Sequence, residues 1–447
     1  MILTGKLIGK YMLRRPIVWL AVITIAVSVF IQLVVMTIMD GLIRDFADKN
    51  HALVGDCVIT SSSLTGFPYY DELIDELEGD AQILAASPVI HSSALLSMDD
   101  GDWTQAVDLI GIKPDSYCMV TGFCDSLYRK SYSGGIFDHP HGQGPGCIRG
   151  ISMMNAKSGS GTYNHSLDYP VKLEISGFPL TWKGTLANEA TGLINSQSFY
   201  VANDSDTGVP LVDDFTIYVP FEQAGKICGM DTAAARVNRI FIKFEQGIPL
   251  EQGVSGVREI FKRFISENSG SQFASLFEQV QVKSWKVHLV ENIAPMEKER
   301  TMLTALFTLL GLLNVFVVFI VFYIIVNSKH KDIGILRSFG VSRLSLMGMF
   351  TSFSAAIGII GASLGWLGGW AFLRYINELE NWLHTNYGWQ LWDRSIYAIG
   401  LIPNQLNTNV LLWIIFGALT ASILGCLGPA HQAVKQDPVN VLRVGTV

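Results

Sequence analysis

The stretch from Ile17 to Met39, "IVWLAVITIAVSVFIQLVVMTIM", contains no charged residue over 23 positions. As an α-helix it would be about 34 Å long, which is enough to cross the hydrocarbon core of a bilayer. A helix in a water-soluble core would show a polar face at helical spacing, and this stretch shows almost none. We therefore predict a membrane span.

A cleaved signal peptide is the alternative interpretation of this stretch. The apolar run is longer than the core of a signal peptide, and "MDGLIRDF" follows where a cleavage site would need small residues. These two features favour an uncleaved anchor.

Three further stretches have the same apolar character, and they divide a chain of 447 residues that is 49% hydrophobic and 16% charged. The fold class predicted is an α-helical membrane protein with four transmembrane helices and a large α+β periplasmic domain inserted between helices 1 and 2. The predicted segments are an N-terminus at 1–16, spans at 17–39, 302–326, 348–373 and 410–428, a periplasmic domain at 40–301, a coupling segment at 327–347, a periplasmic loop at 374–409 and a C-terminus at 429–447.

Lys and Arg residues predict the orientation of these spans. Ten cations flank the spans on one side, against two aspartates. They are Lys6, Lys10, Arg14, Arg15, Lys329, Lys331, Arg337, Arg343, Lys435 and Arg443. Because positive residues stay in the cytoplasm, both termini and the segment between spans two and three are predicted to be cytoplasmic.

Residues 40–300 then lie outside, and they are acidic. They contain 20 Lys and Arg against 34 Asp and Glu, a balance of −14, whereas the whole chain carries −7. An acidic exterior does not favour nucleic acid as a partner.

Short alternating runs in this exterior segment predict strands at "DCVITSS", "VKLEISGF", "FTIYVPF" and "RIFIKFE". Helices are predicted at "DELIDELEG" and "GVSGVREIFKRFISEN". The stretch from Tyr132 to Gly161 is rich in Gly, Ser, Pro and His, which predicts a loop.

Five of the six cysteines lie in this exterior segment, where an oxidising compartment would permit disulfides. Cys118 and Cys124 are close enough in sequence to pair, but an odd number leaves at least one thiol over. Packing thiols without any bridge remain the alternative.

We find no convincing catalytic, cofactor or metal motif in the sequence. "GASLG" fits the nucleophile elbow, but it lies within a span with no strand before it. Gly361, Gly365 and Gly369 fall four apart on one helical face, which predicts close helix packing instead. The phosphate-binding pattern G-x-x-x-x-G-K-[ST] is absent, so the chain is predicted not to be an enzyme that hydrolyses ATP.

Strongly polar side chains within the spans are limited to Gln32 and Asn314, and we expect each to form a hydrogen bond between helices. Such sparse polarity argues against an ion or sugar pathway and suits a lipidic cargo, or no cargo.

The stretch "KDIGILRSFGVSR", Lys331–Arg343, gathers cations around a glycine between the second and third spans. Ile333, Leu336 and Phe339 recur every third residue, which predicts a short amphipathic helix. The glycine that follows can end this helix, and Ser342 can cap the next one. From periodicity alone, the helix could lie on lipid, support the spans or dock into a partner.

"HKDIGILRSFGVSRLSLMGMF" closely resembles the stretch after the second span in FtsX-like permeases of ABC transporters, where it couples the permease to a cytoplasmic ATPase. The resemblance therefore implies ATPase coupling at Lys331, Asp332, Ile333, Gly334, Leu336, Arg337, Gly340 and Arg343. The C-terminal "GPAHQAVKQDPVNVLR" is similar to that family's ending.

Within this superfamily the resemblance is strongest to lipoprotein-releasing (LolC/LolE-type) permeases. "VMTIMDGLIRDF" resembles their exit from span one, with Asp40-Gly41 where that family usually has Asn-Gly. "DDFTIYVPFEQAGKI" and "YAIGLIPNQLN" also resemble segments of these permeases. The hook by which they hold a periplasmic chaperone would fall near Leu186–Asn195, where its proline and basic character is missing.

The resemblance implies a permease subunit that binds no cofactor itself. Its partners would be an ABC ATPase that holds ATP and Mg, a second permease copy or paralogue, membrane lipid, and a periplasmic chaperone or effector. Acyl chains enter such permeases between spans one and two, which here implies a cargo cavity at Val35, Met39, Leu306 and Leu310. Simple packing or contact with lipid is the alternative for these four residues.

Two other functions stay open from the sequence. One is a signal transmitter that moves no cargo and regulates a periplasmic cell-wall hydrolase. The other is an efflux permease that works with a periplasmic adaptor.

Overall fold

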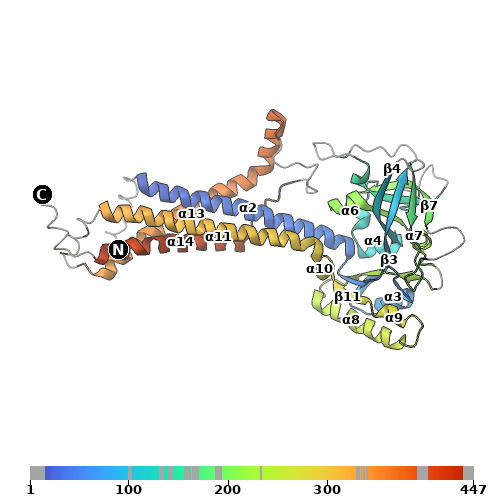
Figure 1. Ribbon diagram of the computed structural model, residues 1–447. Helices are drawn as coiled ribbons and strands as arrows, with labels where there is room; N and C mark the ends of the chain where they lie inside the picture. The colour runs from blue at the N-terminus through green and yellow to red at the C-terminus, as the bar shows by residue number, and fades with distance from the viewer. Residues whose placement is uncertain are drawn as a thin grey trace. The chain divides into compact units, whose positions relative to one another are not determined.

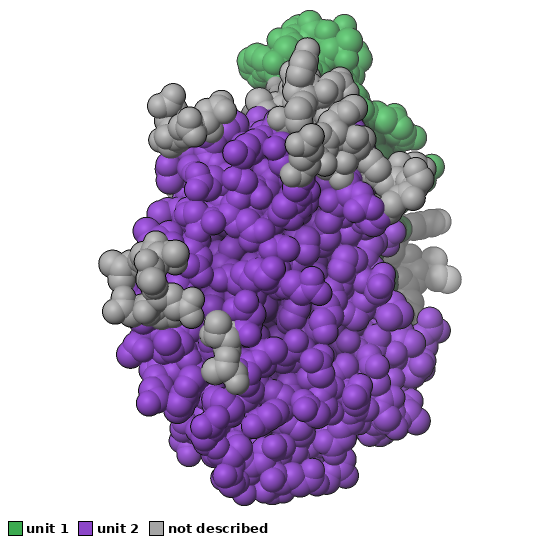
Figure 2. Space-filling view, turned by 90° about the vertical axis from the view of Figure 1, so that its right-hand side faces the viewer, with its two compact units in different colours: residues 1–44, 295–392, 401–447 green, residues 45–294, 393–400 purple. Residues whose placement is uncertain are grey.

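The computed structural model describes residues 16–98, 103–129, 135–138, 144–155, 163, 171–186, 194–231, 234–328, 333, 335, 338, 341–389 and 401–435. The chain divides into two compact units, which Figures 1 and 2 show. Unit 1 comprises residues 1–44, 295–392 and 401–447. Unit 2 comprises residues 45–294 and 393–400.

Four helices provide the apolar segments of unit 1. They are α2 (Pro16–Val54), α11 (Val290–Ser328), α13 (Arg343–Tyr387) and α14 (Thr408–Lys435). Each contains a window that is long and apolar enough to cross a membrane. The prediction of four apolar helices is therefore confirmed.

All four helices extend beyond the predicted spans. Helix α2 continues past Met39 to Val54, and α13 continues past Leu373 to Tyr387. The first part of the predicted loop 374–409 is therefore helical, because no Gly or Pro interrupts the sequence before Gly388. Gly388 ends the helix with φ of +66°, a conformation that glycine adopts without strain.

The helices of unit 1 share one apolar core, to which all four contribute. Its fully buried members include Val22, Ile25, Val318, Phe322, Ile357 and Cys426. Ser354 of α13 and Ser422 of α14 exchange hydrogen bonds inside this core, from each Oγ to the other backbone carbonyl at 2.7 and 2.6 Å.

Unit 2 is built on a nine-stranded sheet with the order β11-β1-β10-β3-β4-β8-β5-β7-β6. The strands are β1 (Cys57–Ser61), β3 (Ile83–Met98), β4 (Trp103–Ile112), β5 (Gly146–Gly150), β6 (Lys172–Gly177), β7 (Asn195–Ser205), β8 (Thr216–Pro220), β10 (Arg239–Phe244) and β11 (Val280–Ser284). The far half of β3 also pairs with β6, so the six strands from β3 to β6 close into a ring. Closure removes the exposed edges that an open sheet would present.

Short helices cover both faces of this sheet. They are α3 (Tyr70–Glu78), α4 (Pro114–Val120), α5 (Phe123–Ser126), α6 (Pro210–Phe215), α7 (Phe221–Cys228), α8 (Leu250–Glu267), α9 (Ala274–Phe277) and α10 (Trp285–His288). A small second sheet pairs β2 (Phe67–Pro68) with β9 (Arg236–Val237). One core includes Leu73, Ile240 and Phe261, and the core on the opposite face includes Tyr117 and Phe241.

The predicted strands are confirmed as β1, β6, β8 and β10, and the predicted helices as α3 and α8. The prediction of a loop from Tyr132 to Gly161 is wrong at β5 and at the 3-10 turn η2 (Ile151–Met153). The glycines at the two ends of β5 lie where a Cβ would collide with the carbonyls of Phe137 and Asp213. A glycine-rich sequence thus conceals a buried strand, because neighbouring backbone comes too close for side chains.

Cys118 and Cys124 form a disulfide between α4 and α5, which confirms the pairing considered from the sequence. Cys57, Cys147, Cys228 and Cys426 are free and buried.

Candidate functional site

A groove of about 600 Å³ lies between α2, α11 and α14 of unit 1. Its lining includes Val29, Met36, Phe307, Leu312, Trp413 and Leu424. Among the lining residues that the structure describes, Arg300 carries the one formal charge. The groove is therefore an apolar site of ligand size with few polar groups.

Two hydrogen bonds cross from α2 to α11 beside the groove. The side-chain amide of Gln32 donates to the carbonyl of Phe307 at 3.2 Å, and that of Asn314 donates to the Ser28 hydroxyl at 2.7 Å. The expectation that Gln32 and Asn314 bond between helices is confirmed. These bonds satisfy polar groups that would otherwise face hydrocarbon.

The four predicted cargo residues are Val35, Met39, Leu306 and Leu310, and none is among the residues that line the groove. The lining uses their neighbours Gln32, Met36, Phe307 and Gly311 instead. Successive helical residues differ by about 100° in direction, so a shift of one position selects a different face. The helices that border the groove could therefore be predicted from the sequence, but the face of each helix that lines the groove could not.

An ion pair joins α2 and α11 next to the same groove. The Asp40 carboxylate lies 2.7 Å from Nε of Arg300, with only 9% of the Asp40 side chain exposed. The adjacent Gly41 lies against Pro403, where a Cβ would overlap the proline ring. The backbone before that proline is fixed by Asn377, whose amide bonds both the N–H and the carbonyl of Ile402. The Asp-Gly and Ile-Pro stretches of the sequence therefore meet in space.

The glycines at 361, 365 and 369 of α13 lie against α2. A Cβ at Gly361 would come within 2.9 Å of Ile25, and one at Gly369 within 2.9 Å of Leu33. At Gly365 it would lie 2.5 Å from the carbonyl oxygen of Ala26. Such distances leave no room for a side chain, so the two helix backbones approach closely there.

Of the eight predicted coupling residues, the structure describes Ile333 and Arg343. The other six, Lys331, Asp332, Gly334, Leu336, Arg337 and Gly340, lie outside the described residues. Ile333 is buried in the core of the helices, and Arg343 is the exposed first residue of α13. Ser342 caps α13, accepting a hydrogen bond from the N–H of Ser345 at 3.2 Å, as predicted.

Exposed apolar side chains accompany these residues. Ile335 is 43% exposed and Leu344 is 82% exposed. Both lie in the predicted coupling segment 327–347, but neither was among the eight residues predicted to couple to the ATPase. The signal for Leu344 is its place just inside the capped N-terminus of α13, where the buried face begins only at Leu346.

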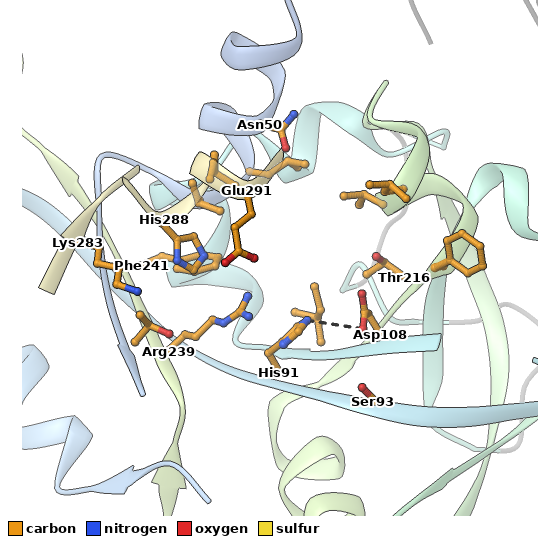
Figure 3. A pocket seen from close by; sticks show the side chains of 18 of the residues that line it. Asn50, His91, Ser93, Asp108, Thr216, Arg239, Phe241, Lys283, His288 and Glu291 are labelled. Atoms are coloured by element: carbon orange, nitrogen blue, oxygen red, sulfur yellow. Dashed lines mark ion pairs between the residues drawn. The ribbon is translucent and has the colours of Figure 1, made fainter. Parts of the chain in front are cut away.

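A second cavity, of about 800 Å³, lies within unit 2 (Figure 3). Its floor is the face of the sheet that carries Arg239, His91 and Asp108. Residues at the end of α2 and the start of α11, among them Asn50 and Glu291, complete its wall. None of these residues was singled out from the sequence, because they come from separate strands and helices and share no motif.

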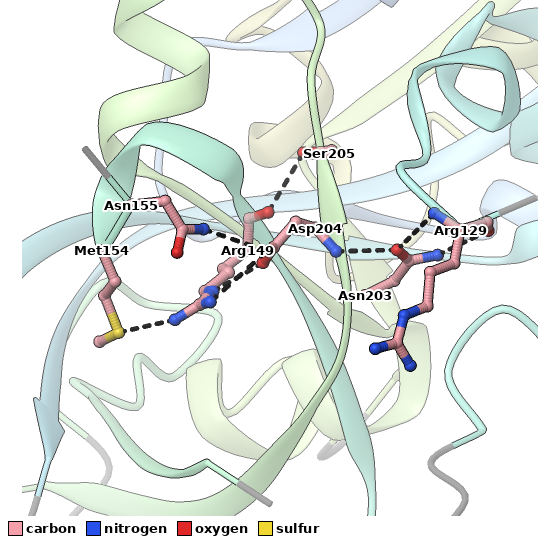
Figure 4. Close-up of polar contacts among 7 residues, drawn as sticks. All are labelled: Arg129, Arg149, Met154, Asn155, Asn203, Asp204 and Ser205. Atoms are coloured by element: carbon pink, nitrogen blue, oxygen red, sulfur yellow. Dashed lines mark hydrogen bonds and ion pairs between the residues drawn. The ribbon is translucent and has the colours of Figure 1, made fainter. Parts of the chain in front are cut away.

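A buried polar cluster at β5 and β7 is structural (Figure 4). Nε of Arg149 lies 2.6 Å from the Asp204 carboxylate, and both side chains are almost fully buried. Asn155 donates a further hydrogen bond to that carboxylate at 3.2 Å. A buried charge pair needs these additional bonds because water no longer solvates it.

Comparison with known proteins identifies the helical part of the chain. Residues 304–438 match the family model for the FtsX-like permease C-terminal region. This part of the chain is similar to FtsX-like permeases of ABC transporters. That match includes α13, α14, the coupling stretch and most of α11.

Similarity to lipoprotein-releasing permeases extends over nearly the whole permease chain. It is 22% identical to the lipoprotein-releasing system transmembrane protein LolC of Xylella fastidiosa (strain Temecula1) over 95% of this chain and 92% of that protein. It is 23% identical to LolC of Neisseria meningitidis serogroup B over 94% of this chain and 92% of that protein. The resemblance to FtsX-like and LolC-type permeases is confirmed.

Two solved structures resemble part of this permease. The periplasmic region of MacB from Actinobacillus actinomycetemcomitans is 12% identical with a TM-score of 0.30, covering 54% of this chain and 96% of that one. The extracellular domain of the ABC-type transporter YknZ from Gram-positive bacteria is 13% identical with a TM-score of 0.27, covering 52% and 99%.

Similarity to this family implies an ABC ATPase as a partner and a pairing of permease subunits. Such permeases are membrane subunits, which fits a chain that performs no catalysis of its own. Within the described part of the chain, no group of three or more His, Cys, Asp or Glu side chains could hold a metal ion.

Proposed function

We propose that this permease extracts lipoproteins, or other lipidic cargo, from the outer leaflet of the inner membrane. The observation that carries the proposal is the apolar groove between α2, α11 and α14 in a chain similar along its length to lipoprotein-releasing transmembrane proteins. Acyl chains need an apolar cavity, and this groove has a single charged lining residue among those described.

The charge in the groove suits the same cargo. Arg300 lines the groove and also pairs with Asp40, so its guanidinium lies near one end of an otherwise uncharged lining. A lipid whose chains occupy the apolar wall would place its polar headgroup next to a cation. In this proposal Val35, Met39, Leu306 and Leu310 border the path by which acyl chains reach the groove.

The orientation proposed follows the Lys and Arg distribution, with both termini and the coupling segment in the cytoplasm and unit 2 in the periplasm. A separate ATPase would bind ATP and Mg, and a second permease copy or paralogue would complete the transporter. Docking of the ATPase would use the segment from Lys331 to Arg343. Buried Ile333 supports this role because it ties the segment to the helix core, while exposed Ile335 and Leu344 remain free to be covered by a partner.

The groove is tested by filling it. Gly417 of α14 lines the groove and has no atom within 4 Å of a Cβ position. Gly417→Phe should abolish lipoprotein release in proteoliposomes that contain the ATPase, and should abolish the stimulation of ATP hydrolysis by a triacyl lipoprotein. Gly348→Phe on α13 is the matched control, because that glycine also has open space but does not line the groove. Equal release by the wild type and the Gly417 variant would disprove the proposed cargo site.

The docking segment is tested by co-purification with the ATPase. Reversing the charge of Arg337 and Arg343 together, or introducing Leu344→Glu, should detach the ATPase while the spans stay folded. Leu64→Glu is the control for the leucine, since Leu64 is also exposed but belongs to unit 2. An ATPase that stays bound to all the variants would contradict this assignment.

A further inference from the structure

The cavity of unit 2 has a cationic end and an apolar end. On the floor, Thr60 of β1 pairs with Arg239 of β10 and with Gln281 of β11, while Ser93 of β3 pairs with Asp108 of β4. Because alternate residues of a strand share a face, Lys283, Arg239, His91 and Asp108 all point to the same side of the sheet. The cations therefore lie at the end of the cavity floor formed by β11 and β10, and β4 and β8 form the other end.

Apolar side chains line the opposite end. Leu211, Val212 and Phe215 come from α6, which directly precedes β8. Leu211 is 61% exposed and Phe215 is 43% exposed, so this wall is open to an occupant. Tyr117 and Tyr218 extend the wall, with ring centroids 6.5 Å apart. From β10 to β8 the floor spans three strand spacings, or roughly 14 Å.

Arg239 is the unusual residue of this cavity. Figure 3 shows its guanidinium between the imidazole rings of His91 and His288. Within the described residues, the guanidinium has no hydrogen bond and no ion pair, although burial lowers its pKa. The Asp108 carboxylate attracts this cation but does not pair with it directly, so an anion from outside the chain would offset the cost of its burial.

The two histidines are suited to the same anion. Burial, together with the charge of Arg239, lowers the pKa of His91 to about 3 and that of His288 to about 4. Both rings are therefore neutral near pH 7 and can donate one hydrogen bond each. The other charged groups that line the cavity are Lys283, Asp108 and Glu291, of which Asp108 lies 3.9 Å from Nε2 of His91.

We propose that this cavity binds an organic anion, a carboxylate or phosphate carried on an apolar chain. The anionic group lies between Arg239, His91 and His288, and the chain lies along the wall formed by α6 and the two tyrosines. The occupant would also contact Leu53 of α2 and Leu289 before α11, the two helices that continue along the chain into the apolar segments.

Binding of such an anion must be coupled to the protonation of the side chains around it. A negative charge between the two imidazoles favours their protonated forms and raises both pKa values in the complex. Protonation of Asp108, whose pKa is raised by burial, would remove repulsion and act in the same direction. After correction for the second ionisation of the phosphate monoester, whose pKa is about 6, affinity should increase as the pH falls from 7.5 to 5.5.

The test is calorimetric titration of the full chain in nanodiscs with octyl phosphate, after subtraction of empty nanodiscs. Arg239→Gln should weaken binding at least about tenfold, which corresponds to one buried charge-assisted contact. Lys262→Gln on the exposed face of α8 removes the same charge outside the cavity and should change nothing. Equal binding by the wild type and the Arg239 variant would overturn the proposal.

Two further ligands separate the halves of the site. Inorganic phosphate and 1-octanol should each bind at least tenfold more weakly than octyl phosphate. If phosphate alone binds as tightly, the apolar end is not part of the site; if octanol does, the anion site is wrong. If Arg239→Gln fails to fold, two other measurements test the anion site: binding by Lys283→Gln and the pH dependence of wild-type binding. An affinity that does not change with pH would refute the role of the histidines.

Discussion

Replacing Gly365 by alanine should loosen the packing of α13 on α2. The added Cβ would lie 2.5 Å from the carbonyl oxygen of Ala26 and 2.8 Å from Cβ of Val29. Ordinary contact begins at 3.4 Å, so the two backbones must separate by about 0.9 Å, the difference between 3.4 and 2.5 Å. Both obstacles are atoms at or next to the backbone, which cannot rotate away.

The cost of this substitution follows from overpacking. Forcing extra atoms into a close-packed site costs about 1–3 kcal/mol. Alanine favours the helix by about 1 kcal/mol over glycine, which offsets part of that cost. Gly361 and Gly369 contact the same helix one turn away on either side, so a local separation also disturbs their contacts. We expect a net loss of up to about 2 kcal/mol for Gly365→Ala.

Gly348→Ala is the matched control for this prediction. Gly348 lies on the same helix, and no atom is within 4 Å of its Cβ position. In thermal unfolding of the protein in nanodiscs, the Gly365 variant should unfold at a lower temperature than the wild type, whereas the Gly348 variant should be unchanged or more stable. Equal stability of the two variants would refute the close approach of α13 to α2.

The remaining predictions concern unit 2 and are measured by chemical unfolding of the full chain. Asp204→Asn should lower the free energy of unfolding by about 3–5 kcal/mol, because it leaves Arg149 as an uncompensated buried charge; exposed Asp206→Asn is the control, and equal effects would contradict this. The free energy of unfolding should also fall as the pH drops below 6.5. In the unfolded chain both histidines bind a proton near pH 6.5, whereas in the folded protein the pKa of His288 is about 4 and that of His91 is about 3. Each histidine should contribute a slope of about 1.4 kcal/mol per pH unit in that window, and replacing both by glutamine should remove it; an unchanged slope would refute their burial in neutral form.

The helices could be predicted from the sequence because lipid imposes a simple rule on them. Each span must be long, apolar and nearly free of charge, and such runs are visible without any knowledge of packing. Strands with clean alternation, such as β10, were equally visible. β3 was missed because "ILAASPVIHSSALLSM" mixes Pro88 with serines and alanines of low strand propensity. Pairing with β10, β4 and β6 overrides that local preference.

The sites were harder to predict, for a geometric reason. The groove lies between the expected helices, but a different face of these helices lines it, because successive residues of a helix point about 100° apart. In the cavity of unit 2, His91 lies more than a hundred residues before Arg239 and His288. The register of β3 with β10 brings His91 and Arg239 together, and helix α10 carries His288. No periodicity within a single segment contains that information. A sequence motif for such a site would have to span β3, β10 and the turn after β11.

The packing of unit 1 indicates where the helices can separate. Glycines bring helix backbones together at three contacts: Gly365 joins α13 to α2, Gly358 meets Ser422 of α14 at 3.0 Å, and Gly425 of α14 meets the carbonyl of Val315 on α11 at 2.5 Å. Among the described residues, no glycine makes such a contact between α2 and α11, where the groove lies. That seam is held by the hydrogen bonds of Gln32 and Asn314 and by one ion pair. Hydrogen bonds can exchange partners, whereas closely packed backbones cannot. If the proposed coupling segment transmits a force from the ATPase, we therefore expect the bundle to open between α2 and α11 and the groove to widen.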